Sequence, residues 1–466
     1  MDSKNEYQGM WWLPEKPENK FVGALTFPQN EGAELRIIGC FDKHNLLEPI
    51  IILGETTDGK KISLINCIQT DLRTSHPGGE TSVFEIDFIF IGVHFLKIED
   101  VKFKSLSVHF SYLDEWLDFK SLNERNGANG EIIISFKKPG SVKTKLKDGT
   151  EITIDIVGNI VHPPDMHTEL RLNSKSFIII KPQQEKSFQE FRGIIRTIQN
   201  FITLALGEEV SEPLSITGIT EVNKQLIGGQ PYNPPVTIIN RFVKSNNHKK
   251  MMKHKMIFSF DTISHRFSAF LNTWFENASS FKTIFDLYFG IKYNPSLYVD
   301  NQFLNCIIAV EAFHRYDVEG EYLSEAEYET IRQTLVDAIP ASIDKFHRQS
   351  LENRIKYGYE YSMIKRLSEI TQTYEKNIGM FIDDTALFNK QVVDTRNYMI
   401  HNTHAPKESV CEGKDLIILT KKLKLLLEVL LLRKLGFTEE ETNNLISKHE
   451  RFKLKYIENS VILSYI

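Results

Sequence analysis

Cysteine is scarce in this sequence, with four residues among 466. None of them stands in a C-x-x-C pair, the spacing that structural zinc sites commonly use. Their wide separation also argues against the disulfide framework of small secreted domains. We therefore expect no metal site and no cofactor. The four residues are Cys40, Cys67, Cys306 and Cys411.

A long uncharged apolar run is missing too. The most apolar stretch, Leu416 to Leu435, contains six charged side chains, which is too many for a membrane span. It predicts a helix buried in a protein core. Residues 1–10 are polar and lack the apolar segment of a signal peptide. We expect no membrane partner and a cytoplasmic location.

The sequence also has no excess of positive charge, because its formal net charge is −5. A nucleic-acid-binding protein of this charge has to gather its basic side chains locally. The densest basic segment spans residues 244–255. Within it, Lys249, Lys250 and Lys253 are candidates for contacts to an RNA backbone. A solvated linker is the more usual meaning of such a run.

The first 182 residues contain short apolar runs separated by turns. Leu35–Phe41, Ile50–Leu53 and Ile62–Cys67 are three of these runs, and Thr57–Lys60 predicts a hairpin turn between the last two. Many short strands of this kind predict an antiparallel β-sandwich or barrel. We expect Trp11-Trp12, near the start, to fix the N-terminal segment to the core of this domain rather than to form an exposed recognition element.

The periodicity changes at Ser187. Ser187 and Glu190 match a capping box, helical spacing follows, and Gly207 is the expected end of the helix. Residues 183–255 are interpreted as this helix and a connecting segment, and residues 256–466 as a helical bundle. Within the bundle, Ser324 with Glu327 and Thr438 with Glu441 match two further capping boxes. Because single cores seldom grow beyond about 250–300 residues, we expect separate domains. The predicted fold class is α+β, with a β-rich domain at 1–182 and an all-α domain at 256–466.

One short motif near the C-terminus combines residue types that suit RNA cleavage. Arg396, Asn397 and His401 fall at the end of a predicted helix, Thr385–Ile400. At about 100° per residue, Asn397 and His401 share one helix face, and Arg396 lies about 140° from His401. The imidazole can move a proton near neutral pH. The guanidinium can bind a phosphate, and the amide can orient either partner.

A single helix supplies one histidine, whereas transesterification needs a base for the 2′-hydroxyl and an acid for the leaving 5′-oxygen. Two copies related by a two-fold axis would supply both, so we expect a homodimer with a composite site. The nucleophile belongs to the RNA, and no metal is required. The plainer interpretation is that Arg396 and His401 cap the helix end, or that Arg396 pairs with Asp394.

An upstream helix offers a weaker candidate. Glu311, followed by His314, is expected on a helix that precedes the motif. Glu311 is a candidate for supporting the active site behind Arg396, Asn397 and His401. A buried polar contact between two helices is an equally good interpretation of this pair.

The segment Thr395–His401 resembles the signature of HEPN domains, which is Arg, a polar residue and, after four to six intervening residues in total, His. Ala309–Arg315 is similar to the upstream segment of ApeA-type HEPN domains. Three N-terminal segments resemble the ApeA N-terminal domain, and together the likeness covers most of the chain in the expected order. These segments are Met10–Glu15, Gly23–Phe27 and Gly54–Lys60.

The resemblance implies an all-helical HEPN ribonuclease that acts as a dimer and halts host growth during phage infection. It also implies that the N-terminal domain senses a phage-encoded trigger or restrains the nuclease. A zinc-binding element thought to occur in some ApeA-like proteins is not carried over, because the chain has no cysteine cluster. The alternative is a catalytically inactive HEPN-like dimerisation or binding module with a ligand-sensing β domain.

Overall fold

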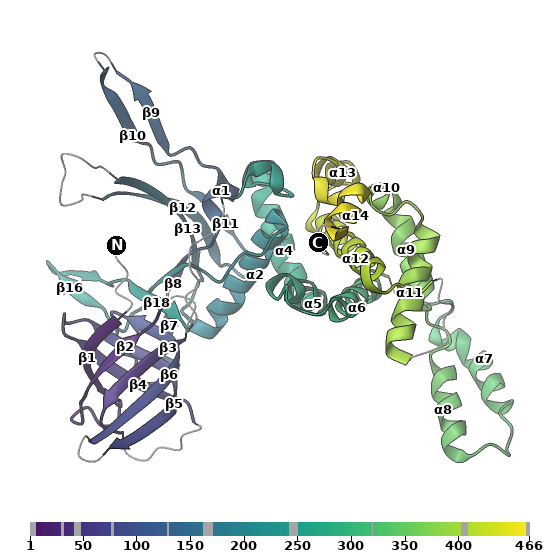
Figure 1. Ribbon diagram of the computed structural model, residues 1–466, viewed down its shortest axis with the longest axis horizontal. Coiled ribbons are helices and arrows are strands. Elements are labelled where there is room, and N and C mark those ends of the chain that lie inside the picture. Colours follow the sequence, from purple (N-terminus) through teal and green to yellow (C-terminus); the bar gives the residue numbers. More distant parts are fainter. Residues whose placement is uncertain are drawn as a thin grey trace. The chain divides into compact units, whose positions relative to one another are not determined.

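The structure is a computed structural model that describes residues 6–28, 32–41, 48–75, 79–127, 130–161, 171–241, 250–318, 320–401 and 409–462. Its contacts divide the chain into two compact units, one ending at Asn272 and the other beginning at Thr273 (Figure 1). The first unit is rich in strands and the second is helical. The α+β prediction is therefore confirmed.

Six antiparallel strands of the first unit close into a barrel. They follow the order β6-β3-β2-β1-β4-β5, and β5 pairs back onto β6. Strand β3 shows why this sheet has an inside, because Ala33, Leu35 and Ile37 alternate with outward-facing residues and are fully buried. The strands are β1 (Glu6–Trp12), β2 (Phe21–Thr26), β3 (Ala33–Ile38), β4 (Ile50–Thr56), β5 (Lys61–Ser75) and β6 (Gly79–Ile91).

The two tryptophans of β1 are buried, as predicted. The indole N–H of Trp11 donates a 3.1 Å hydrogen bond to the carbonyl of Gly23. Gly54 of β4 lies so close to this ring that a Cβ there would come within 2.3 Å of it. The predicted hairpin turn between β4 and β5 is also present, and Gly59 adopts a φ of +79° in it. Local sequence signals therefore set much of the barrel.

The sheet continues beyond the barrel, because the end of β6 also pairs with β18. Further antiparallel strands follow in the order β18-β15-β8-β13-β12-β11. Three two-stranded sheets accompany them: β9 (Leu122–Asn126) with β10 (Ile132–Phe136), β7 (Lys102–Phe103) with β14 (Lys186–Ser187), and β16 (Gln225–Ile227) with β17 (Gln230–Tyr232). The strands of the extension are β8 (Ser105–His109), β11 (Val142–Lys145), β12 (Glu151–Val161), β13 (Arg171–Lys181), β15 (Ser215–Ile219) and β18 (Val236–Asn240).

Helix α2 (Phe188–Leu206) packs against this extension. Its Ile198 and Phe201 face Ile152 and Ile178 of the strands around a small apolar cavity. The predicted capping box begins the helix at Ser187, and Gly207 ends it with a φ of +72°. Residues 183–255, interpreted from the sequence as a helix and a connecting segment, belong to the first unit, because β15 and β18 pair with β8 and β6. Two short helices, α1 (Leu113–Leu117) and α3 (Phe260–Ile263), complete this part.

Helix α12 (Gly413–Leu435) is the centre of the second unit, with leucines buried on all sides. This confirms the core helix predicted for Leu416–Leu435. Two predicted capping boxes, Ser324 with Glu327 and Thr438 with Glu441, also begin helices as expected. The other helices are α4 (Phe267–Ser280), which crosses the division, α5 (Lys282–Tyr293), α6 (Val299–Asp317), α7 (Glu325–Asp337), α8 (Lys345–Lys356), α9 (Met363–Thr373), α10 (Glu375–Ile378), α11 (Thr385–His401), α13 (Glu439–Ser447) and α14 (Leu454–Ile462).

A buried ion network crosses the core of the helical unit. The carboxylate of Glu428 in α12 is fully buried, and it accepts hydrogen bonds from Arg451 at 2.6 Å and from the hydroxyl of Tyr288 at 2.7 Å. Lys292 lies 3.0 Å from the same group. Burial acts to raise the pKa of Glu428, but Arg451 and Lys292 outweigh it and lower the pKa to about 2. The carboxylate is therefore ionised inside the bundle.

All four cysteines are free thiols, and three of them are buried. Along the described ranges, none of the helices has both the length and the apolar character needed to cross a bilayer.

Candidate active site on helix α11

Helix α11 carries the predicted motif, and its sequence explains where the helix starts. Oδ1 of Asp384 accepts a 2.8 Å hydrogen bond from the N–H of Leu387 and so caps the first turn. Phe388, Val392 and Thr395 recur at i, i+4 and i+7 and are buried. This apolar stripe faces the bundle and leaves the opposite side of the helix for the motif.

Asn397 and His401 lie one turn apart on that outer side, because the helix continues without a break to His401. His401 is exposed, while Arg396 and Asn397 are half-buried. Nη1 of Arg396 donates a 3.1 Å hydrogen bond to Oδ1 of Asn397. This contact positions the guanidinium beside the amide and leaves the amide NH2 of Asn397 available as a donor.

Apolar side chains lie next to these polar groups. Tyr398 is 37% exposed and Ile400 is 48% exposed. Within the part of the chain that the structure describes, Arg396 forms no ion pair with a carboxylate, so the expected alternative of a pair with Asp394 is not formed there. The surface around the motif thus offers a cation, an imidazole and apolar area together.

The chain that follows the motif is tied back onto α11. The hydroxyl of Thr395 accepts a 3.0 Å hydrogen bond from the N–H of Cys411, and both residues are buried. Burial raises the pKa of the Cys411 thiol, which argues against a role as a nucleophile. Residues 402–408 lie outside the described ranges.

Helix α9 supports α11 from the inside. The amide nitrogen of Asn389 donates a 2.9 Å hydrogen bond to the hydroxyl of Thr371 and a longer one, 3.4 Å, to that of Ser368. Asn389 and Thr371 are both buried. A buried polar contact of this kind fixes how α11 is rotated relative to α9.

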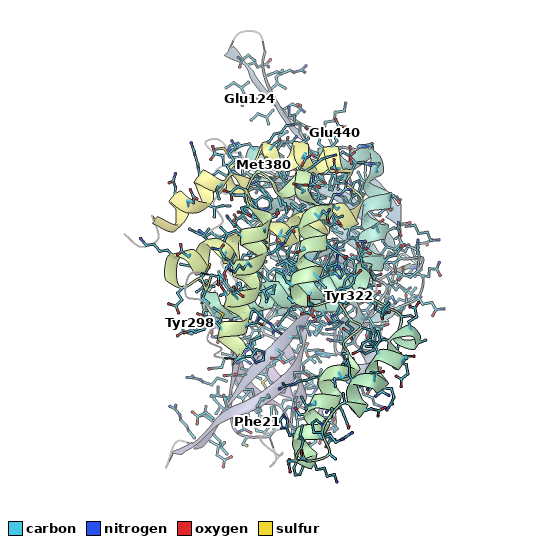
Figure 2. All side chains as sticks on the ribbon, turned by 90° about the vertical axis from the view of Figure 1, so that its right-hand side faces the viewer. Phe21, Glu124, Tyr298, Tyr322, Met380 and Glu440 are labelled. Atoms are coloured by element: carbon cyan, nitrogen blue, oxygen red, sulfur yellow. The ribbon has the colours of Figure 1, made fainter. Side chains whose placement is uncertain are left out.

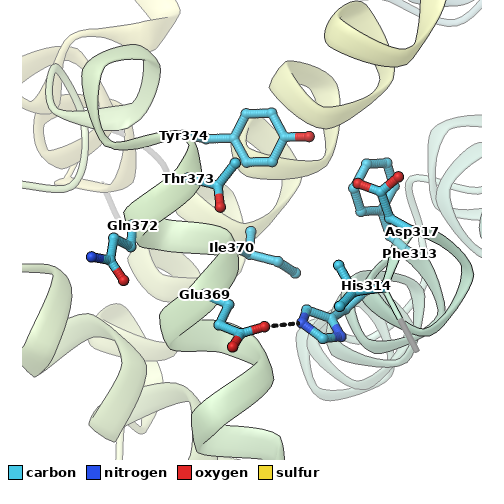
Figure 3. Close-up of a pocket in the computed structure, with 9 residues that line it drawn as sticks. Phe313, His314, Asp317, Glu369, Ile370, Gln372, Thr373 and Tyr374 are labelled. Atoms are coloured by element: carbon cyan, nitrogen blue, oxygen red, sulfur yellow. Dashed lines mark hydrogen bonds and ion pairs between the residues drawn. The ribbon is translucent and has the colours of Figure 1, made fainter. Parts of the chain in front are cut away.

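A second polar cluster joins α6, α9 and the strand-like segments beside them. His314 is buried, and its Nε2 donates a 2.9 Å hydrogen bond to Glu369 (Figure 3). Its Nδ1 accepts one of 3.2 Å from the guanidinium of Arg366. Arg366 is 1% exposed and also donates to the carbonyls of Gly320 and Tyr361, at 3.2 and 3.1 Å. The buried contact between helices that the sequence allowed for His314 is therefore present.

Glu311 belongs to the exposed edge of the same cluster. Its carboxylate lies 3.1 Å from Arg315, which in turn lies 2.7 Å from Glu360. In the described ranges, its hydrogen bond and its ion pair are both to Arg315 rather than to Arg396, Asn397 or His401. A supporting role for Glu311 behind the motif stays a prediction.

A cavity of about 240 Å³ opens beside this cluster between α6 and α9 (Figure 3). Burial acts to raise the pKa of Glu369 at its edge, but hydrogen bonds from His314 and Lys365 hold that pKa below its ordinary value. None of the three motif residues lines this cavity. Its lining residues are Phe313, His314, Asp317, Val318, Glu369, Ile370, Gln372, Thr373 and Tyr374.

The basic segment predicted to contact RNA lies in the first unit. Lys250 is exposed, and the ammonium of Lys253 lies 3.5 Å from Asp118 and 3.6 Å from Asp261. Lys249 lies outside the described residues. The two acidic neighbours of Lys253 are compatible with the ordinary solvated segment that the sequence also allowed, and a contact of these lysines with RNA stays a prediction.

The three motif residues together are suited to act on a phosphodiester. Arg396 offers a planar pair of donors to phosphate oxygens, and His401 faces solvent where it can exchange a proton with a bound substrate. Among the residues described, no group of three or more His, Cys, Asp or Glu side chains is arranged to hold a metal ion. One chain supplies a single histidine from this motif, so both proton transfers would need a second copy.

Sequence reasoning missed Arg366, Glu369 and Thr395 as structural partners of this region. Arg366 looks like any surface arginine in the sequence, because two of its partners, Gly320 and His314, lie 46 and 52 positions away. Thr395 could have been noticed, since it falls on the apolar stripe of α11 one residue before Arg396.

Comparison with known families gives two matches, in the order that the sequence predicted. The model of the family described as ApeA N-terminal domain 1 matches residues 6–274, which is more than half of the chain. The model described as Apea-like HEPN matches residues 304–441 and includes all of α11. Searches among curated proteins and among solved structures found no match.

Proposed function

The chain belongs to the ApeA family, with an ApeA N-terminal domain followed by an ApeA-like HEPN domain, and from this premise we propose that it is a metal-independent endoribonuclease. The family supports a HEPN protein of anti-phage defence. The proposal adds that this protein cuts RNA during phage infection and so stops the growth of the infected cell. A phage-encoded trigger acting through the ApeA N-terminal domain is part of the same proposal.

The observation that supports this activity is the outer side of α11. Asn397 and His401 lie one turn apart on it, and the guanidinium of Arg396 is hydrogen-bonded to Asn397. The three side chains therefore offer a phosphate-binding cation, an amide donor and a proton-transfer group at one end of one helix.

The proposed reaction is a transesterification at a site shared by two copies. One His401 removes the proton of the RNA 2′-hydroxyl, and the 2′-oxygen of the RNA then attacks the adjacent phosphorus. The other His401 protonates the leaving 5′-oxygen as the P–O bond breaks. The products are a 2′,3′-cyclic phosphate and a 5′-hydroxyl end, and no metal takes part. Tyr398 and Ile400, exposed next to the motif, provide apolar area that such a dimer would cover.

The direct test is RNA cleavage by the wild type and by His401→Ala. Cells expressing each protein are infected, and RNA 5′-hydroxyl ends are sequenced. We expect new ends with the wild type and none with His401→Ala. With purified protein, an RNA carrying a single 2′-deoxy sugar at the cut should resist cleavage, because the nucleophile is missing. Unchanged cleavage by His401→Ala would refute the site, and cleavage at the 2′-deoxy position would refute the mechanism.

A further inference from the structure

Helices α7 and α8 form a hairpin that projects from the helical unit (Figure 1). Its base is closed by backbone hydrogen bonds, from Tyr322 N to Tyr359 O at 2.7 Å and from Tyr361 N to Gly320 O at 2.8 Å. Tyr322, labelled in Figure 2, stacks edge-on against Tyr361 with ring centroids 4.7 Å apart. Hydrogen bonds and a ring contact therefore hold the base of the hairpin in a defined structure.

The two helices of the hairpin hold each other by a few contacts. The hydroxyl of Tyr328 in α7 donates a 2.7 Å hydrogen bond to the carbonyl of Ile355 in α8. Arg348 donates to the carbonyl of Ile339, just after α7, at 3.3 Å, and its guanidinium pairs with Glu352 at 2.9 Å. The inner side of α8, which faces α7, is formed by half-buried residues: Arg348, Leu351, Glu352 and Ile355.

Two exposed aromatic rings stand in line on the outer side of the hairpin, one in the first turn of α8 and one at its C-cap. Phe346 is 79% exposed and Tyr357 is 53% exposed. They stand eleven positions apart (346 and 357), which on a helix is three turns plus about 20°, or about 16 Å along the axis. Gln349 and Asn353 fall between them on the same strip and are exposed as well.

Basic side chains flank this strip on both sides. Lys345 and Lys356 lie about 80–100° to one side of it, and Arg354 lies about 80° to the other. All three are exposed, and within the described ranges none forms an ion pair. The ammonium of Lys356 lies 5.2 Å from the centre of the Tyr357 ring, so this cation and this ring lie side by side. The single acid of α8, Glu352, is on the inner side and is already paired with Arg348. Asp344, just before α8, caps the first turn of that helix, and the other acids of the two helices are on α7.

We infer that the outer face of α8 is a docking surface for single-stranded RNA. Bases stack on Phe346 and Tyr357, while the cations that flank the strip contact the phosphates. The amides of Gln349 and Asn353 can hydrogen-bond to base edges between the two rings. The choice of RNA as the nucleic acid rests on the proposed ribonuclease function. The inference adds that the hairpin binds the RNA substrate.

RNA fits this face better than a protein partner does. Three turns of one helix, about 18 Å long and about 10 Å wide, offer on the order of 200 Å². A stable protein interface buries about 800 Å² on each side. Stacking needs only the area of each ring, and the nearest acids, Asp344 and Glu352, already accept hydrogen bonds within the hairpin. A cationic rim of this kind suits a polyanion.

The test measures RNA binding by the full chain in a His401→Ala background, so that the probe is not cut. The probe is a fluorescein-labelled single-stranded RNA of mixed sequence, and binding is read by fluorescence anisotropy. Adding Phe346→Ala and Tyr357→Ala should raise Kd at least about tenfold, since removing each stacked ring weakens binding severalfold. Tyr298→Ala is the matched control, because Tyr298 is 80% exposed at the N-cap of another helix, α6 (Figure 2); the Kd of this variant should equal that of the parent.

A second set of variants tests the charges. Replacing Lys345, Arg354 and Lys356 by Ala should flatten the plot of log Kd against log salt by about 0.7 for each phosphate that the protein no longer neutralises. Lys376→Ala, which removes a lysine that is 76% exposed and pairs with Glu439, should leave the slope as it was.

The outcomes separate this inference from the proposed function. If the parent does not bind the probe, or if the two aromatic substitutions leave Kd unchanged, the inference is overturned whether or not the wild type cuts RNA. If binding depends on α8 but the wild type never cuts RNA, even in infected cells, only the proposed function fails. If the substitutions change the sedimentation of the protein and not its RNA binding, α8 contacts protein and the inference is wrong.

Discussion

The hydroxyl oxygen of Thr395 accepts a hydrogen bond from the backbone N–H of Cys411 across a gap of 3.0 Å. Thr395 precedes Arg396 and faces the bundle, whereas Asn397 and His401 lie on the opposite side of the helix. One buried contact therefore fixes both the last turns of α11 and the chain that re-enters the bundle behind them. The position of the proposed catalytic groups depends on it.

Replacing Thr395 by Val should destabilise the protein by about 1–3 kcal/mol, because the Cys411 N–H then stays buried without an acceptor. Thr395→Ser keeps the hydroxyl and should recover most of this stability. Urea unfolding of the two variants measures the difference. We also expect Thr395→Val to cut RNA more slowly than Thr395→Ser. Equal stabilities of the two variants would show that the hydrogen bond contributes nothing.

Arg396 tests the phosphate-binding role. Arg396→Lys keeps the positive charge but loses the planar pair of donors, so the cleavage rate under single-turnover conditions should fall about tenfold or more. The cleavage rate of Arg396→Ala should fall by a factor of about 10²–10³, as it does when a charge-stabilising donor is removed from an active site. Arg36→Lys, an exposed arginine of the barrel paired with Glu34, is the control. An Arg396→Lys rate equal to the wild type would contradict the role assigned here.

Mixing subunits tests the composite site. If each site needs a His401 from both copies, a dimer of wild type and His401→Ala is inactive. Equal amounts of the two chains are mixed and allowed to exchange subunits. About one quarter of the random dimers are then wild type in both chains. The mixture should therefore have about one quarter of the activity of the same total amount of wild-type protein. Activity of about one half would mean that each chain works alone. The measurement is the initial cleavage rate against the fraction of variant chain.

Glu428 makes the stability of the helical unit depend on pH. Its pKa in the folded protein is about 2, below the ordinary value of 4.5, so the unfolded chain binds a proton first as the pH falls. The ionised carboxylate of Glu428 stabilises the folded protein by on the order of 3 kcal/mol at neutral pH. This contribution is fully present above about pH 4.5 and is lost as the pH falls towards 2. Glu428→Gln should remove this contribution, because Arg451 and Lys292 then no longer face a carboxylate.

Denaturation of the wild type and Glu428→Gln at several pH values measures this contribution as the gap between two curves. The gap should be wide at pH 7 and narrow steadily below about pH 4.5. Glu329→Gln, at an exposed carboxylate paired with Arg332, should track the wild type throughout. A gap that does not depend on pH would contradict the ionised carboxylate.

Arg366 anchors the hairpin that we propose as the RNA-holding element. Arg366→Met leaves the carbonyls of Gly320 and Tyr361 without their donor and should destabilise the unit by about 3–5 kcal/mol, as expected for breaking a buried charged network. Amide hydrogen exchange should rise in α7 and α8 before it rises in α12. Arg332→Met is the control, since it removes a half-buried arginine of α7 whose ion pair is with Glu329 of the same helix. Unchanged protection in the hairpin would show that Arg366 does not hold its base.

Much of the fold follows from local sequence. The strand that begins in the apolar run at Leu35, the turn around Gly59 and the three capping boxes each involve a few neighbouring residues, and each was predicted and is present. The helical spacing of α11 likewise placed Asn397 and His401 on one face. These features depend on backbone geometry and short-range hydrogen bonds, which act the same wherever the segment ends up.

The sequence by itself thus determined the elements, the order of the two domains and the motif on α11. Only the tertiary structure decided that β5 pairs back onto β6 to close the barrel, and that β15 and β18 join its extended sheet. It also decided that Arg366 is buried against His314, while Phe346 stands in solvent. Strand pairing and side-chain burial depend on contacts between segments that are far apart in the sequence. A short window of neighbouring residues therefore does not predict them.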